Sequence, residues 1–95
     1  MEHTVYILFS KKLDRFYTGE TADFNTRLKF HREAPAHKFT AKAKDWELFL
    51  KFQCDCKPQA LQIEGHIKKM KSKTYIRNLL KYPEIIDKLK NKYPC

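Results

Sequence analysis

The sequence predicts an α+β fold, in which a three-stranded antiparallel sheet is flanked by helices and followed by C-terminal helices. Two observations predict the sheet: short aromatic and β-branched segments at 4–8 and 16–18, and an alternating apolar segment at 46–52. Apolar residues at helical spacing around these segments predict the helices. With 95 residues, the chain is expected to form one domain over residues 1–95 with a single core.

The first two strands are predicted to form a hairpin. Residues 5–9 are continuously apolar and residues 16–18 are aromatic and β-branched, and a polar segment separates them. The first helix is expected over residues 24–32, because Asp23 is a good N-cap and Pro35 closes the segment.

The third strand and three more helices follow. Residues 46–52 show strand periodicity, and Pro58 suits the first turn of a second helix that is expected to end near Ser72. Two shorter helices are predicted at 75–81 and 84–92. Pro83 lies between them and interrupts the helical pattern. Their apolar residues are expected to complete the core; docking onto a partner protein is the alternative.

The charge of the chain favours a polyanionic partner. Its 20 Lys and Arg against 11 Asp and Glu give a formal charge of +9, so nucleic acid is the leading candidate. A generally basic, soluble surface is the alternative. The lysines expected to contact nucleic acid lie in a basic connection and around the second helix: Lys38, Lys42, Lys68, Lys69, Lys71 and Lys73.

No apolar run approaches the roughly 20 residues that span a bilayer, and the N-terminus lacks a signal-peptide pattern. The chain is therefore expected in the cytoplasm, without a membrane partner. Its three cysteines make an odd count, and the spacing of Cys54 and Cys56 is too tight for the usual zinc half-site. Reduced thiols of minor structural importance are expected.

Four side chains have the chemistry to act on a phosphate ester. Tyr6 and Tyr17 lie on the two strands of the hairpin, so that their phenol oxygens can meet at one end of the sheet. Arg27 and His31 are four residues apart on a helix, and they can reach the same phosphate. Ordinary strand packing of the tyrosines and a solvated basic face on the helix are the alternatives.

Glu64 is the candidate metal ligand. It is the only carboxylate between Asp55 and Glu84, in a stretch rich in lysine. A single carboxylate suits Mg²⁺, which keeps most of its waters and takes substrate phosphate as a further ligand. The alternative is a salt bridge from Glu64 to Lys68, four residues further along the helix.

The order of these five residues resembles the GIY-YIG nuclease domain, and most closely its small stand-alone members. The segments Thr4-Val5-Tyr6 and Tyr17-Thr18-Gly19 match its two motifs, and the resemblance covers nearly the whole chain. It implies that Tyr17 activates the attacking water and Tyr6 assists by hydrogen bonding. It further implies that Arg27 and His31 stabilise phosphate charge, and that Glu64 holds one Mg²⁺ or Mn²⁺ ion.

The implied function is a divalent-metal-dependent endonuclease that hydrolyses DNA, in repair or recombination, with a targeting protein as a further expected partner. The sequence departs from the family pattern at three positions. The first motif has no glycine, Thr18 replaces isoleucine, and Glu20 stands where the related excision-repair incision domain carries lysine. A negative charge there would weaken phosphate binding or add a metal contact. A catalytically weak or inactive nucleic-acid-binding module is therefore the alternative.

Overall fold

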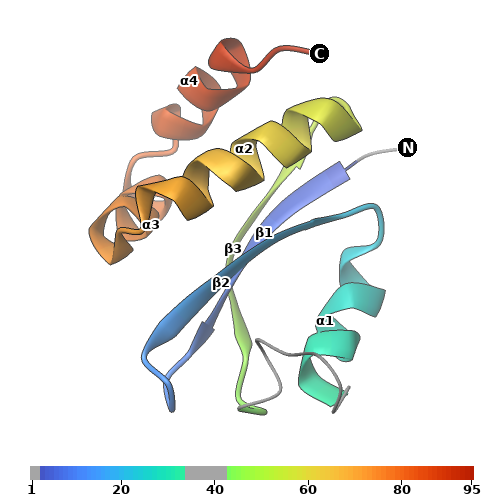
Figure 1. The fold of residues 1–95 in the computed structure, drawn as a ribbon, viewed down its shortest axis with the longest axis vertical. Coiled ribbons are helices and arrows are strands. Elements are labelled where there is room, and N and C mark those ends of the chain that lie inside the picture. The colour runs from blue at the N-terminus through green and yellow to red at the C-terminus, as the bar shows by residue number, and fades with distance from the viewer. Residues whose placement is uncertain (1–2, 34–42) are drawn as a thin grey trace.

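The computed structural model of the chain describes residues 3–33 and 43–95, with the side chains of residues 30–33 excepted. It confirms the predicted α+β class and each predicted helix and strand (Figure 1). The elements are β1 (His3–Ser10), β2 (Arg15–Thr21), α1 (Phe24–Glu33), β3 (Glu47–Cys54), α2 (Lys57–Met70), α3 (Lys73–Lys81) and α4 (Glu84–Lys92).

The sheet has the order β2-β1-β3, and both pairings are antiparallel. The predicted hairpin joins β1 to β2 through residues 11–14. Asp14 ends this turn with a φ of 51°, a left-handed conformation that aspartate tolerates better than most side chains, and its N–H donates to the Lys11 carbonyl. Because β1 occupies the centre, β2 is an edge strand.

Alternation along β1 directs its side chains into two cores, one on each face of the sheet, instead of the single core expected. Val5 and Ile7 face α2, α3 and α4, and they join the larger core with the apolar residues of those helices. Tyr6 and Leu8 face the opposite way and pack with Trp46 in a smaller core, against which α1 lies. Figure 1 shows α1 on one side of the sheet and the other three helices on the opposite side.

The corner between α2 and α3 is tighter than predicted. Lys71 takes a left-handed φ of 48° directly after α2, so the helix ends before Ser72. The Ser72 hydroxyl then caps α3 by accepting the Tyr75 backbone N–H at 3.1 Å, which starts this helix at Lys73 rather than near residue 75. Of the helices in the described ranges, none has the length and apolar composition needed to cross a membrane.

A disulfide joins Cys56, the N-cap residue of α2, to Cys95, 39 residues further along the chain. The prediction of reduced thiols is therefore wrong for this pair, although Cys54 keeps a free and buried thiol. The error has a physical cause: the pairing depends on how α4 packs on α2, which returns the C-terminus to the start of α2. Cysteine spacing carries no information about that packing.

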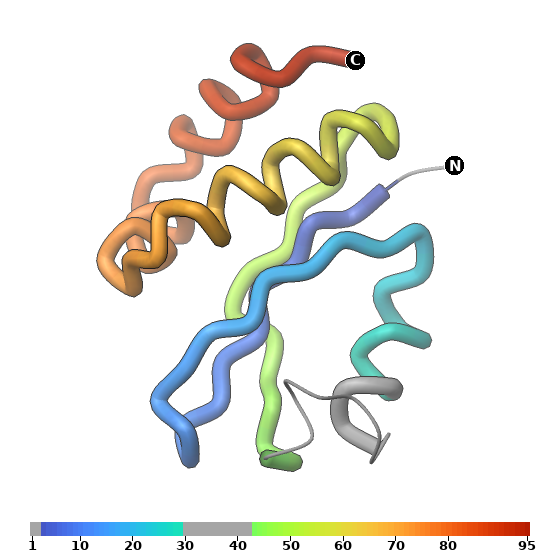
Figure 2. The backbone as a smooth tube through the Cα atoms, viewed as in Figure 1, coloured from blue at the N-terminus to red at the C-terminus, as the bar shows by residue number. Residues whose placement is uncertain are grey.

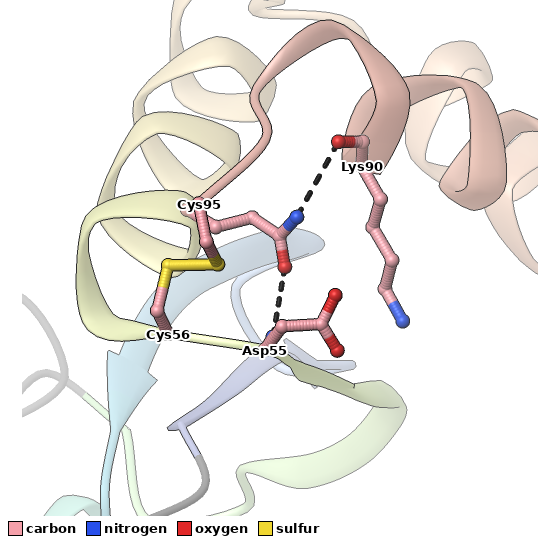
Figure 3. The surroundings of a disulfide bond; sticks show 5 residues. Asp55, Cys56, Lys90 and Cys95 are labelled. Atoms are coloured by element: carbon pink, nitrogen blue, oxygen red, sulfur yellow. Dashed lines mark hydrogen bonds between the residues drawn. A yellow bond between two sulfur atoms is a disulfide. The ribbon is translucent and has the colours of Figure 1, made fainter.

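The buried side chain of Gln59 links the same two segments. Its Oε1 accepts the Asp55 backbone N–H at 2.8 Å, and its Nε2 donates to the Lys90 carbonyl at 3.3 Å. Figure 3 shows the Cys56–Cys95 disulfide with Asp55 and Lys90 nearby. The disulfide and these two hydrogen bonds together hold α4 against the first turn of α2.

Replacing both Cys56 and Cys95 by serine is expected to lower the free energy of unfolding by about 3 to 4 kcal/mol, since a loop of roughly 40 residues is no longer closed in the unfolded chain. Urea unfolding with and without reductant measures this difference. Reductant should destabilise the wild type alone. Three alkylatable thiols in the unfolded, unreduced wild type, counted by mass spectrometry, would contradict the pairing.

Candidate functional site

Tyr6 and Tyr17 lie on the same face of the sheet. In the β1–β2 register Tyr6 pairs with Gly19 and Leu8 pairs with Tyr17, so the two tyrosines alternate onto the face that α1 covers. Their ring centroids are 6.4 Å apart, and the Tyr17 ring packs edge-on against Trp46 at 6.5 Å. Two phenols from neighbouring strands therefore meet beside the smaller core.

Gly19 allows the Tyr6 ring to lie across β2. A Cβ atom at Gly19 would collide with the hydroxyl and Cζ of Tyr6. The ring therefore extends from the central strand over its neighbour, and its hydroxyl reaches the edge strand. The glycine is required here for a close approach of a side chain, since its φ is not positive.

Burial raises the pKa of the Tyr6 phenol well above its ordinary value of about 10. The Tyr17 phenol raises this pKa further, Arg27 lowers it, and the carboxylates of Glu64 and Glu20 raise it. Two consequences follow. Tyr6 keeps its proton at neutral pH and can donate a hydrogen bond, and charged groups from α1 and α2 act on this single phenol.

Arg27 is positioned by the first turn of α1. Asp23 caps this helix as predicted: its carboxylate accepts the backbone N–H of Thr26 at 3.2 Å and the Thr26 hydroxyl at 2.8 Å. Phe24 packs edge-on against Tyr6 with centroids 5.6 Å apart, which fixes the rotation of α1 on the sheet. Arg27 is exposed beside this contact, and His31 lies one turn further along, with its side chain outside the described part.

Glu64 approaches from α2, on the other side of the sheet. Its carboxylate is mostly buried, with 19% of the side chain exposed, and it accepts the Lys68 ammonium at 2.9 Å. The same Lys68 Nζ lies 5.7 Å from the centroid of the Tyr17 ring. Side chains of α2 therefore reach past the edge strand to the phenols.

The Glu64–Lys68 ion pair is the arrangement considered as an alternative to metal binding. The pair joins successive turns of one helix and its lysine is half exposed, so it contributes only about 0.3 to 0.5 kcal/mol. A cation with a stronger preference for carboxylate oxygen can displace the lysine, because little free energy is lost with the ion pair. The ion pair is thus compatible with a metal at Glu64.

The carboxylate of Glu64 fits a hydrated Mg²⁺ in its chemistry. It is a hard oxygen ligand near phenols, and one protein carboxylate is a common complement for this ion. Among the described side chains, no group of three or more His, Cys, Asp and Glu is placed to hold a metal. Water and substrate phosphate would have to supply most of the coordination.

Glu20 lies on the opposite face of the sheet from the phenols. It pairs with Val5 in the register, so its side chain points toward the larger core. There its carboxylate is 2.9 Å from the Nδ1 of His3. Glu20 reaches the Tyr6 phenol only as a weak electrostatic effect, the smallest of those that act on its pKa.

The basic residues predicted to contact nucleic acid fall into three groups. Lys68, Lys71 and Lys73 line one groove at the α2–α3 corner, and Lys69 is exposed on α2 outside that lining. Lys38 and Lys42 lie outside the described residues. Arg15 also lines the groove and was missed, although its position two residues before Tyr17 in a strand was a usable signal.

The comparisons with known proteins agree with the fold. A family model described as the GIY-YIG catalytic domain matches residues 2–77, a range that includes β1, β2, α1 and α2. The solution NMR structure of the UPF0213 protein BH0048 from Bacillus halodurans is similar, with 30% sequence identity and a TM-score of 0.54. The match covers 85% of this chain and 84% of that chain. No curated protein is significantly similar to the chain.

The two glycines are expected to respond in opposite directions to substitution by alanine. Gly19→Ala should lower the free energy of unfolding by about 1 to 3 kcal/mol, because the new methyl group displaces Tyr6. Gly65→Ala should raise it by up to about 1 kcal/mol, because this exposed helical position has room and alanine is the better helix former. Urea unfolding of both variants measures the contrast; an unchanged stability of Gly19→Ala would contradict the close approach.

Tyr6 is expected to make the fold sensitive to alkali. Its folded pKa is raised above the unfolded value of about 10, so the unfolded chain releases this proton first and stability falls as the pH rises above about 10. Tyr6→Phe should lose less stability than the wild type over that range, as measured by urea unfolding at increasing pH. Tyr82→Phe, at an exposed ring, should keep the wild-type dependence. Identical curves for all three proteins would contradict the buried phenol.

Proposed function

We propose, because the chain belongs to the GIY-YIG catalytic domain family, that it is a divalent-metal-dependent endonuclease that hydrolyses DNA phosphodiester bonds. One observation carries the proposal. Tyr17, Arg27 and Glu64 come from β2, α1 and α2, and all three act electrostatically on the Tyr6 phenol in β1. This common influence on one phenol supports the proposed roles of an acid–base group, a phosphate-binding cation and a metal ligand.

The two tyrosines take different parts in the proposed reaction. Tyr17, on the edge strand, acts as its phenolate, whose own proton has passed to solvent, and it accepts a proton from the attacking water while the water oxygen forms the new bond to phosphorus. Tyr6 stays protonated, as its raised pKa requires, and donates a hydrogen bond that orients the water or the phosphate. The bond from phosphorus to the leaving oxygen of the sugar then breaks.

Arg27 stabilises the charge that develops on the phosphate. Its planar guanidinium offers paired N–H donors and stays charged at any working pH. His31 is proposed to reach the same phosphate from the next turn of α1, and to donate a proton to the leaving oxygen. The packing of Phe24 against Tyr6 supports the role of Arg27, which lies three residues further along the same helix.

Glu64 is proposed to hold one Mg²⁺ or Mn²⁺ ion. When bound, such an ion neutralises phosphate charge and stabilises the leaving oxygen. Glu64 would supply a carboxylate oxygen to the ion, and Lys68, released from its ion pair, would then turn its ammonium toward the DNA backbone. The formal charge of +9 supports DNA as the polyanion, through attraction to its phosphates.

Glu20 was the main reason to consider an inactive binding module. Its contact with His3, on the far face of the sheet, weakens that reason, because the carboxylate does not point at the proposed phosphate position. Catalysis is therefore favoured over binding alone. If the following experiment shows DNA binding without cleavage, the inactive binding module is the correct function.

Glu64→Gln and Tyr17→Phe are each expected to lower the rate of DNA cleavage at least about 100-fold, the usual effect of losing a proton-transfer group or metal ligand. Cleavage of plasmid, branched and single-stranded DNA is followed with Mg²⁺, with Mn²⁺ and with chelator, and chelator should abolish it. Glu84→Gln, an exposed carboxylate on α4, is the matched control and should cleave like the wild type.

Full activity of Glu64→Gln would contradict the metal-binding role. If the wild type binds DNA in a salt-dependent way but cleaves none of the three substrates with either ion, the inactive module replaces the endonuclease.

A further inference from the structure

A groove of about 700 Å³ lies between β2 and the corner where α2 meets α3, a corner that can be followed in Figure 2. Tyr17 lines this groove and also belongs to the candidate site. Its ring faces the α1 side of the sheet and Phe16 faces the α2 side, so the groove and the site meet at the edge of β2, where the Lys68 Nζ lies 5.7 Å from the Tyr17 ring centroid. The other lining residues are Arg15, Phe16, Thr18, Ile67, Lys68, Lys71, Ser72, Lys73 and Ile76.

The floor of the groove is apolar and firmly supported. Ile67 and Ile76 belong to the larger core and are almost fully buried. The Phe16 ring packs against Phe9 with centroids 4.8 Å apart, and edge-on against Phe49 at 5.0 Å. An aromatic surface held in this way loses little conformational freedom when a flat ligand stacks on it.

The rim of the groove is cationic. Arg15, Lys68, Lys71 and Lys73 are all exposed around it. The N-terminus of α3 adds partial positive charge through its helix dipole, and no acidic residue in the first turn offsets it. Lys73 is 2.9 Å from Asp14, but both side chains are exposed, so this ion pair is weak enough for a phosphate to replace it.

We propose that this groove takes an unpaired nucleotide next to the phosphate that is cut, so that the preferred substrate is DNA with a single-stranded segment. The inference rests on the proposed function, because it places the nucleotide relative to Tyr17. An apolar floor between cations matches a strand whose bases are free: the base covers the floor and its phosphates meet the rim. In an intact duplex the base faces are already stacked, and only the rim could be used.

Binding in the presence of chelator tests the inference without cleavage. Fluorescence anisotropy is measured with a labelled single-stranded oligonucleotide and with the blunt duplex of the same sequence. The single strand is expected to bind at least about tenfold more tightly. Phe16→Leu keeps the apolar volume but removes the aromatic face, and it should weaken single-strand binding by about fivefold or more while leaving duplex binding within twofold.

The rim is tested by Lys71→Gly, which removes one charge and suits the left-handed backbone at this position. It should reduce the slope of log affinity against log salt by about 0.7 for the single strand. Lys57→Gly is the matched control: Lys57 is exposed at the other end of the same helix, about 20 Å away, and should leave the slope unchanged. Circular dichroism confirms that each variant is folded.

Equal affinity for single strand and duplex, or an unchanged single-strand affinity in folded Phe16→Leu, would overturn the inference. Its failure is distinguishable from failure of the proposed function. Cleavage that depends on Glu64 but shows no preference for unpaired DNA removes only the groove's role. Single-strand binding through Phe16 and Lys71 without cleavage removes only the nuclease.

Discussion

The placement of the Tyr6 ring across Gly19 is the constraint on which the candidate site depends. Tyr6 comes from the central strand, and only a neighbour without a side chain lets its hydroxyl reach the edge strand. At that edge the phenol is within electrostatic reach of Arg27 from one side of the sheet and of Glu64 from the other. The edge strand thus brings candidate residues of helices on opposite faces of the sheet near one phenol.

This arrangement separates stability from chemistry along β1. Val5 and Ile7 are buried with the apolar faces of α2, α3 and α4, whereas Tyr6, between them, faces α1 and the site. The same α2 that covers the larger core carries Glu64 and Lys68 past the edge of the sheet. The disulfide and Gln59 hold α4 against the first turn of α2, at the end opposite Lys68. The helix that carries Glu64, the candidate metal ligand, is therefore supported along its length.

Much of the fold could be predicted because its signals are local. Strand alternation, the Asp23 cap and the proline positions gave every helix and strand, and the errors are confined to ends such as the α2–α3 corner, where Lys71 adopts a backbone conformation unusual for lysine. The Cys56–Cys95 disulfide depends on tertiary packing, which spacing does not encode. The face occupied by Glu20 depends on strand register, and the groove depends on three elements meeting. The family resemblance supplied the candidate residues, but only the structure shows which of them lie near the Tyr6 phenol.

Paramagnetic broadening by Mn²⁺ tests the central claim most directly, since it reports where a divalent ion sits without requiring turnover. In amide NMR spectra of the wild type, substoichiometric Mn²⁺ should broaden signals around Glu64 together with those of Gly19 and Tyr17 on β2, and Glu64→Gln should remove the effect. Broadening falls steeply with distance from the ion, so the signal of Cys56, about 12 Å along α2 from Glu64, should be broadened less than those of the residues next to Glu64. Broadening centred elsewhere, or equal broadening in Glu64→Gln, would contradict a metal site shared by α2 and the edge strand.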